Sequence, residues 1–93
     1  MSLTLPAAAG EPMSAVLTAD ATVRYHKFPA VTRQVSLRNT ATNTLWISLD
    51  DGESWFDCAS GTSWDDRVSV QKLWYCTQLG STEFIVIGLA LIA

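Results

Sequence analysis

Histidine and cysteine are scarce in this sequence, which holds one His and two Cys in 93 residues. A structural zinc site needs Cys or His ligands at characteristic spacings, and His26 has no such partner nearby. Cys58 and Cys76 provide at most one disulfide, fewer than a small fold held by disulfides normally contains. We therefore expect no metal and no cofactor, and we interpret the two cysteines as semi-buried free thiols.

Basic residues are also few, because six Lys and Arg stand against nine Asp and Glu, a net charge of −3. This balance argues against binding to a nucleic-acid backbone, which requires a basic surface. Hydrophobic residues make up 48% of the chain and charged residues 16%. A small domain has a high surface-to-volume ratio, so such low charge predicts that some apolar surface is buried against another chain. We expect a homo-oligomer.

Long hydrophobic runs are absent. The longest, residues 84–93, has ten uncharged and mostly apolar residues, whereas a spanning helix needs about 20. The first ten residues lack the basic segment and the long apolar segment of a signal peptide. We expect no membrane segment. Residues 1–12, rich in Ala, Pro and Gly, are interpreted as a flexible N-terminal arm, and residues 13–93 as one domain.

Apolar and polar residues alternate along much of this domain, which is typical of strands. Leu45, Ile47 and Leu49, for example, share one face, with Trp46 on the other. The pattern predicts strands at 13–19, 31–38, 44–49, 67–76 and 83–91, with a hairpin return at 55–56. Turn signals separate them and no segment reads as a helix. The predicted fold class is all-β: a compact antiparallel β-sandwich of about six to seven short strands.

Three places fit this pattern poorly. Residues 20–29 interleave aromatic and basic side chains and receive no assignment, and Trp64-Asp65-Asp66 reads as a polar corner. In the strand at 31–38, Arg33 falls on the apolar face and breaks the alternation.

Residues Ser48 to Trp55 match the Asp-box, S/T-x-D-x-G-x-S/T-W/F, at every fixed position. The motif describes a tight hairpin turn, in which Asp50 accepts hydrogen bonds from loop amides and Gly52 adopts a left-handed conformation. Ser54 then closes the loop and Trp55 covers it. In sialidase-like propellers, where the motif recurs, it serves the fold and not the chemistry. The sequence has no second copy, which excludes a propeller of repeated blades.

Catalytic patterns are missing. The carboxylates around Asp50 and Asp65 suggest Ca²⁺, but they lack EF-hand spacing, and capping of the loop's own amides already explains Asp50. Two carboxylates of a glycosidase need a substrate cleft, for which so small a domain has little room. We find no nucleophile elbow and no Gly-rich phosphate loop. We therefore expect that the protein is not an enzyme.

Four tryptophans remain to be explained. We interpret Trp55 as the plug of the turn and Trp74 as a core residue. Trp46 and Trp64 are expected to be exposed, where an indole anchors a protein interface or stacks on a sugar ring. Together with the Tyr25–Phe28 stretch, represented by Tyr25 and Phe28, these two are the candidate interface residues.

Residues 35–88 resemble small all-β virion proteins of tailed bacteriophages. The most specific part is the hairpin Asn43-Thr-Leu-Trp-Ile-Ser-Leu-Asp-Asp-Gly-Glu-Ser-Trp55, which is similar to their N-x-LW/Y-x-S-x-D-G-G-x-W pattern. Asp51 replaces the more usual Gly, a change that a turn tolerates. Residues 1–30 show no such resemblance.

The resemblance implies a structural protein of the phage particle, most simply a capsid decoration or cement protein. Its expected partners are the major capsid protein or other virion proteins, and its expected location is the virion, assembled in the host cytoplasm. The alternative hypothesis is a small carbohydrate-binding module that uses exposed tryptophans, the only case in which a glycan is expected.

Overall fold

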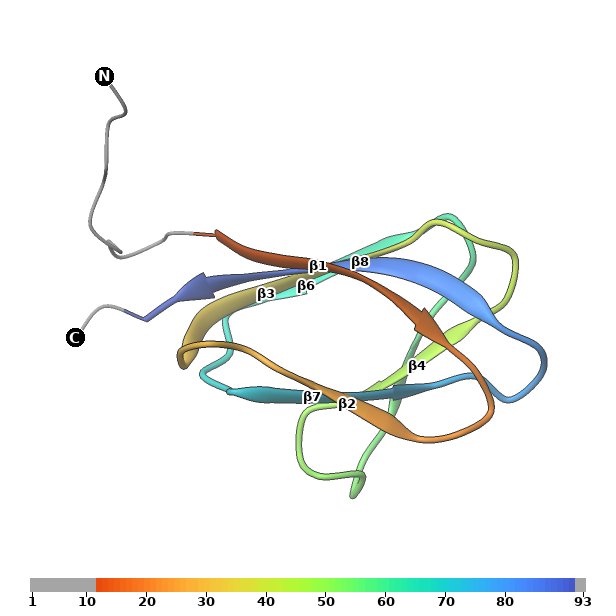
Figure 1. Ribbon diagram of the computed structural model, residues 1–93, viewed down its shortest axis with the longest axis horizontal. Helices are drawn as coiled ribbons and strands as arrows, with labels where there is room; N and C mark the ends of the chain where they lie inside the picture. Colours follow the sequence, from red (N-terminus) through yellow and green to blue (C-terminus); the bar gives the residue numbers. More distant parts are fainter. Residues whose placement is uncertain (1–11, 92–93) are drawn as a thin grey trace.

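The computed structural model describes residues 12–91, which form eight strands and contain no helix. The strands are β1 (Pro12–Ala19), β2 (Arg24–Lys27), β3 (Thr32–Asn39), β4 (Leu45–Ser48), β5 (Phe56–Cys58), β6 (Ser63–Asp66), β7 (Lys72–Cys76) and β8 (Thr82–Ala90). Figure 1 shows them in two layers that face each other. The prediction of an antiparallel β-sandwich is confirmed. The predicted arm, residues 1–12, lies outside the described residues except for Pro12, which begins β1.

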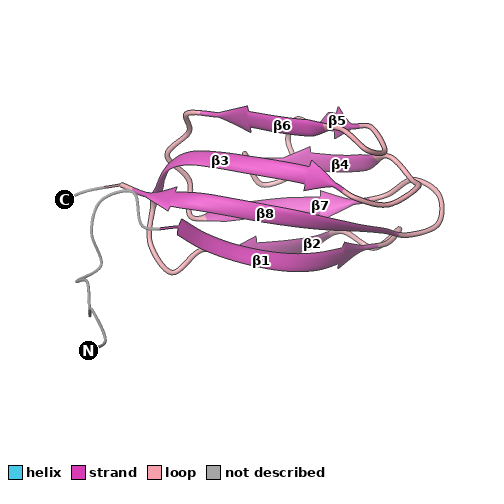
Figure 2. Ribbon diagram, turned by 90° about the horizontal axis from the view of Figure 1, so that it is seen from above, coloured by secondary structure: helices cyan, strands magenta, loops and turns pink. Residues whose placement is uncertain are grey.

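Each layer is a four-stranded antiparallel sheet. Sheet A has the order β1-β8-β3-β6 and sheet B the order β2-β7-β4-β5, and Figure 2 shows sheet A from its outer side. Apart from β4 and β5, strands that follow one another in the sequence lie in opposite sheets. This arrangement of eight strands in two sheets is the jelly roll.

The core lies between the sheets, where alternate residues of every long strand point inward. The buried hydrophobic residues are Ala19, Phe28, Val35, Leu37, Leu45, Ile47, Cys58, Leu73, Tyr75, Phe84 and Val86. Tyr75 of sheet B and Phe84 of sheet A meet edge to face, with ring centroids 5.0 Å apart. An aromatic contact of this geometry adds stabilisation beyond its buried area.

The unassigned residues 20–29 contain β2 and its link to the core. Phe28 follows β2 and is fully buried, while its amide donates to the carbonyl of Gln71 at 2.8 Å. A Cβ at Gly88 would stand 2.9 Å from the Phe28 ring. Glycine at this position of β8 therefore makes room for the ring. The segment escaped prediction because a four-residue edge strand is too short to show alternation.

The predicted strand at 67–76 is confirmed only in its second half, and the predicted corner at Trp64–Asp66 is wrong. Ser63–Asp66 is β6, and only Lys72–Cys76 of the longer segment is a strand. Residues 67–71 instead carry the chain from sheet A to sheet B. Thr32 fixes the position of this connecting segment. Its hydroxyl donates to the carbonyl of Val68 at 2.7 Å, and its amide donates to the carbonyl of Val70 at 2.9 Å.

Arg33 interrupts the alternation of its strand because β3 contains a bulge. The register against β8 shifts between Thr32 and Gln34, so the residue in between has no place in the ladder. Thr32 consequently points into the core and Val31 is 41% exposed, the reverse of the predicted faces for that end of the strand. From Val35 onward the predicted inward positions are correct.

Candidate functional site

The Asp-box segment connects β4 and β5 as a turn held by one carboxylate and two hydroxyls. The Asp50 carboxylate accepts hydrogen bonds from the Ser54 amide, at 2.9 Å, and from the Ser54 hydroxyl. The Ser48 hydroxyl donates to Asp50 and accepts from the Gly52 amide, both at 2.8 Å. Asp51 and Gly52 have φ values of +62° and +82°, a conformation that suits Asp and Gly.

The hydrogen bonds to Asp50 favour its charged form. They lower its pKa from the ordinary 3.8 to about 2, with the Ser54 hydroxyl as the largest cause, followed by the Ser54 amide and the Ser48 hydroxyl. The indole nitrogen of Trp55 donates to the carbonyl of Gly52 at 3.0 Å, which fixes the ring against the turn. The segment therefore supports Trp55 through hydrogen bonds formed within the segment itself.

We expect this carboxylate to make stability depend on pH. Because the folded-state pKa of Asp50 lies below its unfolded value of about 3.9, its contribution is present above about pH 4 and is lost as the pH falls toward 2. Urea unfolding from pH 6 to pH 2 should therefore show Asp50→Asn less stable than wild type at pH 6, with the difference shrinking toward pH 2. Glu53→Gln is the control, since it removes a carboxylate of the same loop that takes no part in these bonds. A constant Asp50→Asn deficit across the range would contradict the assignment.

The candidate interface residues separate into two groups. Tyr25 is 56% exposed, and Trp46 is half-buried on the outer side of sheet B, because its neighbours Leu45 and Ile47 point inward. Phe28 belongs to the core, so the expectation that it contacts a partner is wrong. The prediction that Trp64 is exposed is also wrong. Its ring packs against the ring of Phe56, with centroids 4.6 Å apart, and against the core.

Trp74 was expected in the core, and the structure places it outside. Leu73 and Tyr75 are buried, so Trp74 and Cys76 point to the outer side of sheet B. The Trp74 ring lies 6.3 Å from that of Tyr25 on the neighbouring strand. The apolar pair Leu73 and Tyr75 indicates this placement, because Trp74 lies between them. The prediction instead continued the alternation of Val68 and Val70 as far as Trp74 and so assigned it to the wrong face.

The outer side of sheet B thus carries what we call the aromatic face, defined as Tyr25, Trp46, Trp55 and Trp74. At one end of this face a recess of about 350 Å³ is lined by Val23, Trp46, Trp55, Cys76 and Gln78. Burial raises the pKa of the Cys76 thiol, so that group is neutral at pH 7. A recess of this size, with apolar walls and an amide at its rim, fits the general form of a small-ligand site.

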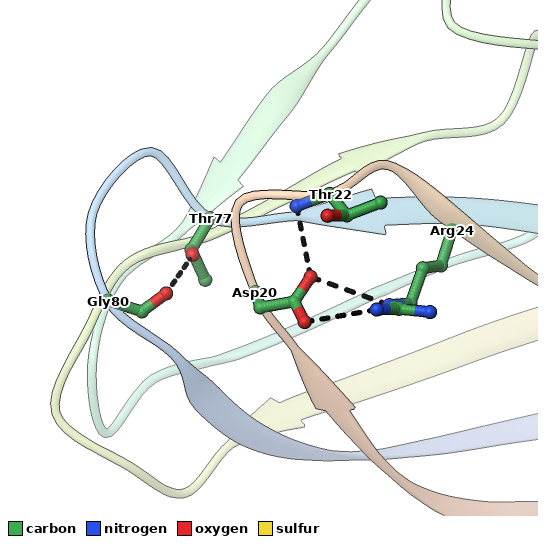
Figure 3. Close-up of polar contacts among 5 residues, drawn as sticks. All are labelled: Asp20, Thr22, Arg24, Thr77 and Gly80. Atoms are coloured by element: carbon green, nitrogen blue, oxygen red, sulfur yellow. Dashed lines mark hydrogen bonds and ion pairs between the residues drawn. The ribbon is translucent and has the colours of Figure 1, made fainter.

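Two of the lining residues, Val23 and Gln78, belong to neighbouring turns, and Figure 3 shows polar contacts within these turns. Asp20 accepts from the Thr22 amide at 2.9 Å and pairs with Arg24 at 3.2 Å. Its backbone carbonyl accepts from the Thr77 amide at 2.8 Å, and the Thr77 hydroxyl donates to Gly80 at 2.6 Å. These contacts join the turn before Val23 to the turn after Gln78. Both lining residues are therefore held in place by the connected turns. The exposed ion pair itself contributes little to stability.

The outer side of sheet A carries a second surface, the aliphatic face, defined as Val16, Ile85, Ile87 and Leu89. In the register of the sheet, Val16 pairs with Ile85, and Ile87 and Leu89 continue along β8. Val16 is 64% exposed and Ile87 36%. The outer positions of a solvated sheet are normally polar. The apolar run at 84–93 is visible in the sequence. Only the strand order shows that its outward-facing residues lie in the middle of a sheet.

The two cysteines do not pair and are both free. Cys58 points into the core and Cys76 away from it, so they lie on opposite sides of sheet B and a disulfide would require the sheet to rearrange. Residues 12–91 contain no cluster of three His, Cys, Asp or Glu side chains that would hold a metal ion. His26 lies against the Phe28 ring at 5.0 Å, and burial lowers its pKa. Nor does this part of the chain hold a helix long and apolar enough to cross a membrane.

Comparison with protein-family models and with curated proteins gives no match for the sequence. Solved structures do show similar folds. A cupin-2 domain containing protein from Shewanella frigidimarina NCIMB 400 is 8% identical with a TM-score of 0.57, over 84% of this chain and 70% of that one. A cupin domain from Bordetella pertussis Tohama I is 11% identical with a TM-score of 0.52, over 95% and 100%.

A third similar structure is an HTH_3 family transcriptional regulator from Vibrio cholerae, 17% identical with a TM-score of 0.63 over 94% of this chain. The chain spans 48% of that regulator's length. Sequence identities this low support the shared fold alone, since one fold hosts many unrelated functions. The comparisons therefore bear on the fold of this chain and not on its function.

Proposed function

We propose that the protein is a non-enzymatic structural subunit of a tailed-bacteriophage particle, of the capsid decoration or cement kind. It acts by burying its aliphatic face against neighbouring subunits, first of all further copies of itself, and each copy adds interfacial free energy to the particle. The observation that carries this proposal is the aliphatic face, an apolar stripe on the outer side of a sheet. The resemblance of residues 35–88 to small virion proteins supplies the phage context.

The size of sheet A supports an interface. β8 has nine residues, which at about 3.3 Å per residue make the sheet about 30 Å long, and strands about 4.8 Å apart make it roughly 15–20 Å wide. Each copy then offers a footprint of about 500 Å², and two copies reach the roughly 1,000 Å² that a specific interface needs. The outer side of sheet A, of which the aliphatic face is a part, is therefore large enough for a modest contact, which many copies in a particle would multiply.

The charges around the aliphatic face support pairing with a second copy. Arg38 of β3 stands beside Ile85 in the register, while Asp65 of β6 and Glu83 of β8 lie on the same outer side. Among residues 12–91 none of these three side chains forms an ion pair. A two-fold contact whose axis passes near Arg38 brings the cation of one copy toward the carboxylates of the other, which favours that orientation over alternatives.

Light scattering across a concentration series tests the proposal. Wild-type protein should have a mass that is a multiple of 10.1 kDa, and Ile87→Lys should shift it to the monomer, because a lysine on each copy places unpaired charge in the contact. The matched control is Leu79→Lys, at a loop position 81% exposed, which should keep the wild-type mass. A wild-type monomer at all concentrations, or equal behaviour of the two variants, would overturn this role for the aliphatic face.

A further inference from the structure

The aromatic face of sheet B takes no part in the contact proposed for sheet A. Its four aromatic rings follow two central strands, an edge strand and the Asp-box turn, and they end at the recess beside Trp46 and Trp55. At the other end, Lys27 and Lys72 stand opposite each other in the register of β2 and β7. We propose that this face binds a short acidic oligosaccharide, with one sugar ring in the recess and an anionic substituent at the two lysines.

The recess suits a sugar ring because apolar and polar groups meet there. The indoles of Trp46 and Trp55 offer flat apolar surfaces, on which the C–H side of a pyranose packs. Gln78 at the rim provides an amide donor and acceptor, and the carboxylate of Asp57, which pairs with Trp46 in the register, accepts from hydroxyl groups. The Asp-box turn holds Trp55 in place through its bond to Gly52, so binding costs little ordering of the platform.

The pair of lysines, Lys27 and Lys72, indicates that the ligand carries negative charge. Like charges directly opposite on neighbouring strands are unfavourable, and among the described residues neither Lys27 nor Lys72 forms an ion pair. The Lys72 ammonium instead lies 4.9 Å from the centre of the Tyr25 ring. An anionic group placed between the two ammonium groups relieves their repulsion, so a carboxylated or sulfated sugar fits this end of the face better than a neutral one does.

The spacing along β7 requires more than one sugar residue. Lys72 and Cys76, which lines the recess, are four positions apart on the same side of the strand, which corresponds to about 13 Å. Tyr25 and Trp74 lie between these ends and provide the stacking surface for the connecting rings. Single-stranded nucleic acid also combines stacking with cationic contacts, but the net charge of −3 and the presence of only two cations on the face disfavour it.

An array of neutral oligosaccharides beside uronate-, sialate- and sulfate-bearing ones tests the ligand class, with oligothymidylate as the nucleic-acid probe. We expect retention of acidic glycans above neutral ones, and weaker retention in higher salt because the lysines are exposed. No selective retention of acidic glycans, or equal retention of oligothymidylate, would overturn the proposal. These readouts do not depend on self-association, so the Ile87→Lys monomer should bind the same glycans.

Calorimetry with the most strongly retained acidic glycan then tests the site. Trp46→Ala should weaken binding about tenfold, the factor that about 1.4 kcal/mol produces, and Lys72→Ala should weaken binding of the acidic glycan but not of its neutral counterpart. Trp64→Phe is the matched control, because Trp64 packs against the core and Phe56, and it should bind as wild type does. Circular dichroism melting checks the fold of each variant. Equal affinities of folded Trp46→Ala and Trp64→Phe would place the ligand elsewhere and overturn the site.

Discussion

Replacement of Phe84 by alanine is expected to lower the free energy of unfolding by about 3–5 kcal/mol. The side chain is fully buried at the centre of sheet A and meets Tyr75 of the opposite sheet edge to face. Its removal takes away both the transfer free energy of the ring and its contacts, and leaves a cavity between the sheets. A domain of 93 residues has a total stability of about 5–14 kcal/mol at about 0.05–0.15 kcal/mol per residue, so the loss is a large fraction of the whole.

Urea unfolding at one fixed protein concentration measures this effect, because self-association adds to the apparent stability. Phe84→Leu should cost clearly less than Phe84→Ala, since it keeps most of the apolar volume. Leu79→Ala removes an apolar side chain that is 81% exposed and should change stability by no more than about 0.5 kcal/mol. Equal shifts for Phe84→Ala and Leu79→Ala would show that Phe84 is not the centre of the core.

The sequence predicted the sandwich because its longest strands carry clean alternation. Val35 and Leu37 in β3, and Phe84 and Val86 in β8, alternate with outward residues over enough positions to define a face. Prediction was less successful for β2 and β6, which have four residues each and lie at sheet edges. An edge strand buries only part of one side, so Arg24–Lys27 and Ser63–Asp66 contain mostly polar or exposed residues, and alternation is lost.

The candidate site was only partly predictable, for a related reason. The position of Trp46 followed from its flanking residues, and the Asp-box pattern located the turn that holds Trp55. Val23 and Gln78 belong to turns far apart in the sequence. The pairing of β2 with β7, extended by the hydrogen bond between the Thr77 amide and the Asp20 carbonyl, brings them to one recess. A contact between turns this far apart leaves no periodic signal in a single sequence.

The jelly roll also explains how one small domain presents two different surfaces. Because consecutive strands mostly alternate between the sheets, each outer face collects residues from distant segments. The aliphatic face joins Val16 near one end of the chain to Ile85 and Ile87 near the other. The aromatic face joins Tyr25 to Trp74. An assembly contact on one sheet and a ligand site on the other therefore do not compete for the same surface.

The buried side chain of Asn39 links the two sheets, and its replacement by alanine is expected to cost about 2–4 kcal/mol. Its Nδ2 group donates to the carbonyls of Asn43, at 2.7 Å, and Cys58, at 2.9 Å. Its Oδ1 atom accepts from the Thr82 hydroxyl at 2.7 Å and the Ala41 amide at 3.3 Å. Asn39 is fully buried, and each buried polar group left without a partner costs about 1–3 kcal/mol.

A double-mutant cycle with Thr82→Val separates this network from simple loss of volume. If Asn39 and Thr82 act through their shared hydrogen bond, the unfolding free energies of the single and double variants should be non-additive by about 0.5–3 kcal/mol. Thr40→Ala is the matched control, since its exposed hydroxyl donates to the Glu83 carbonyl at 3.1 Å and its loss should cost no more than about 1 kcal/mol. Additive costs would show that the hydrogen bond between Asn39 and Thr82, which lie in the same sheet, does not couple them. An Asn39→Ala deficit no larger than that of Thr40→Ala would mean that water satisfies the groups that Asn39 contacts and that its bonds to Asn43 and Cys58 do not join the sheets.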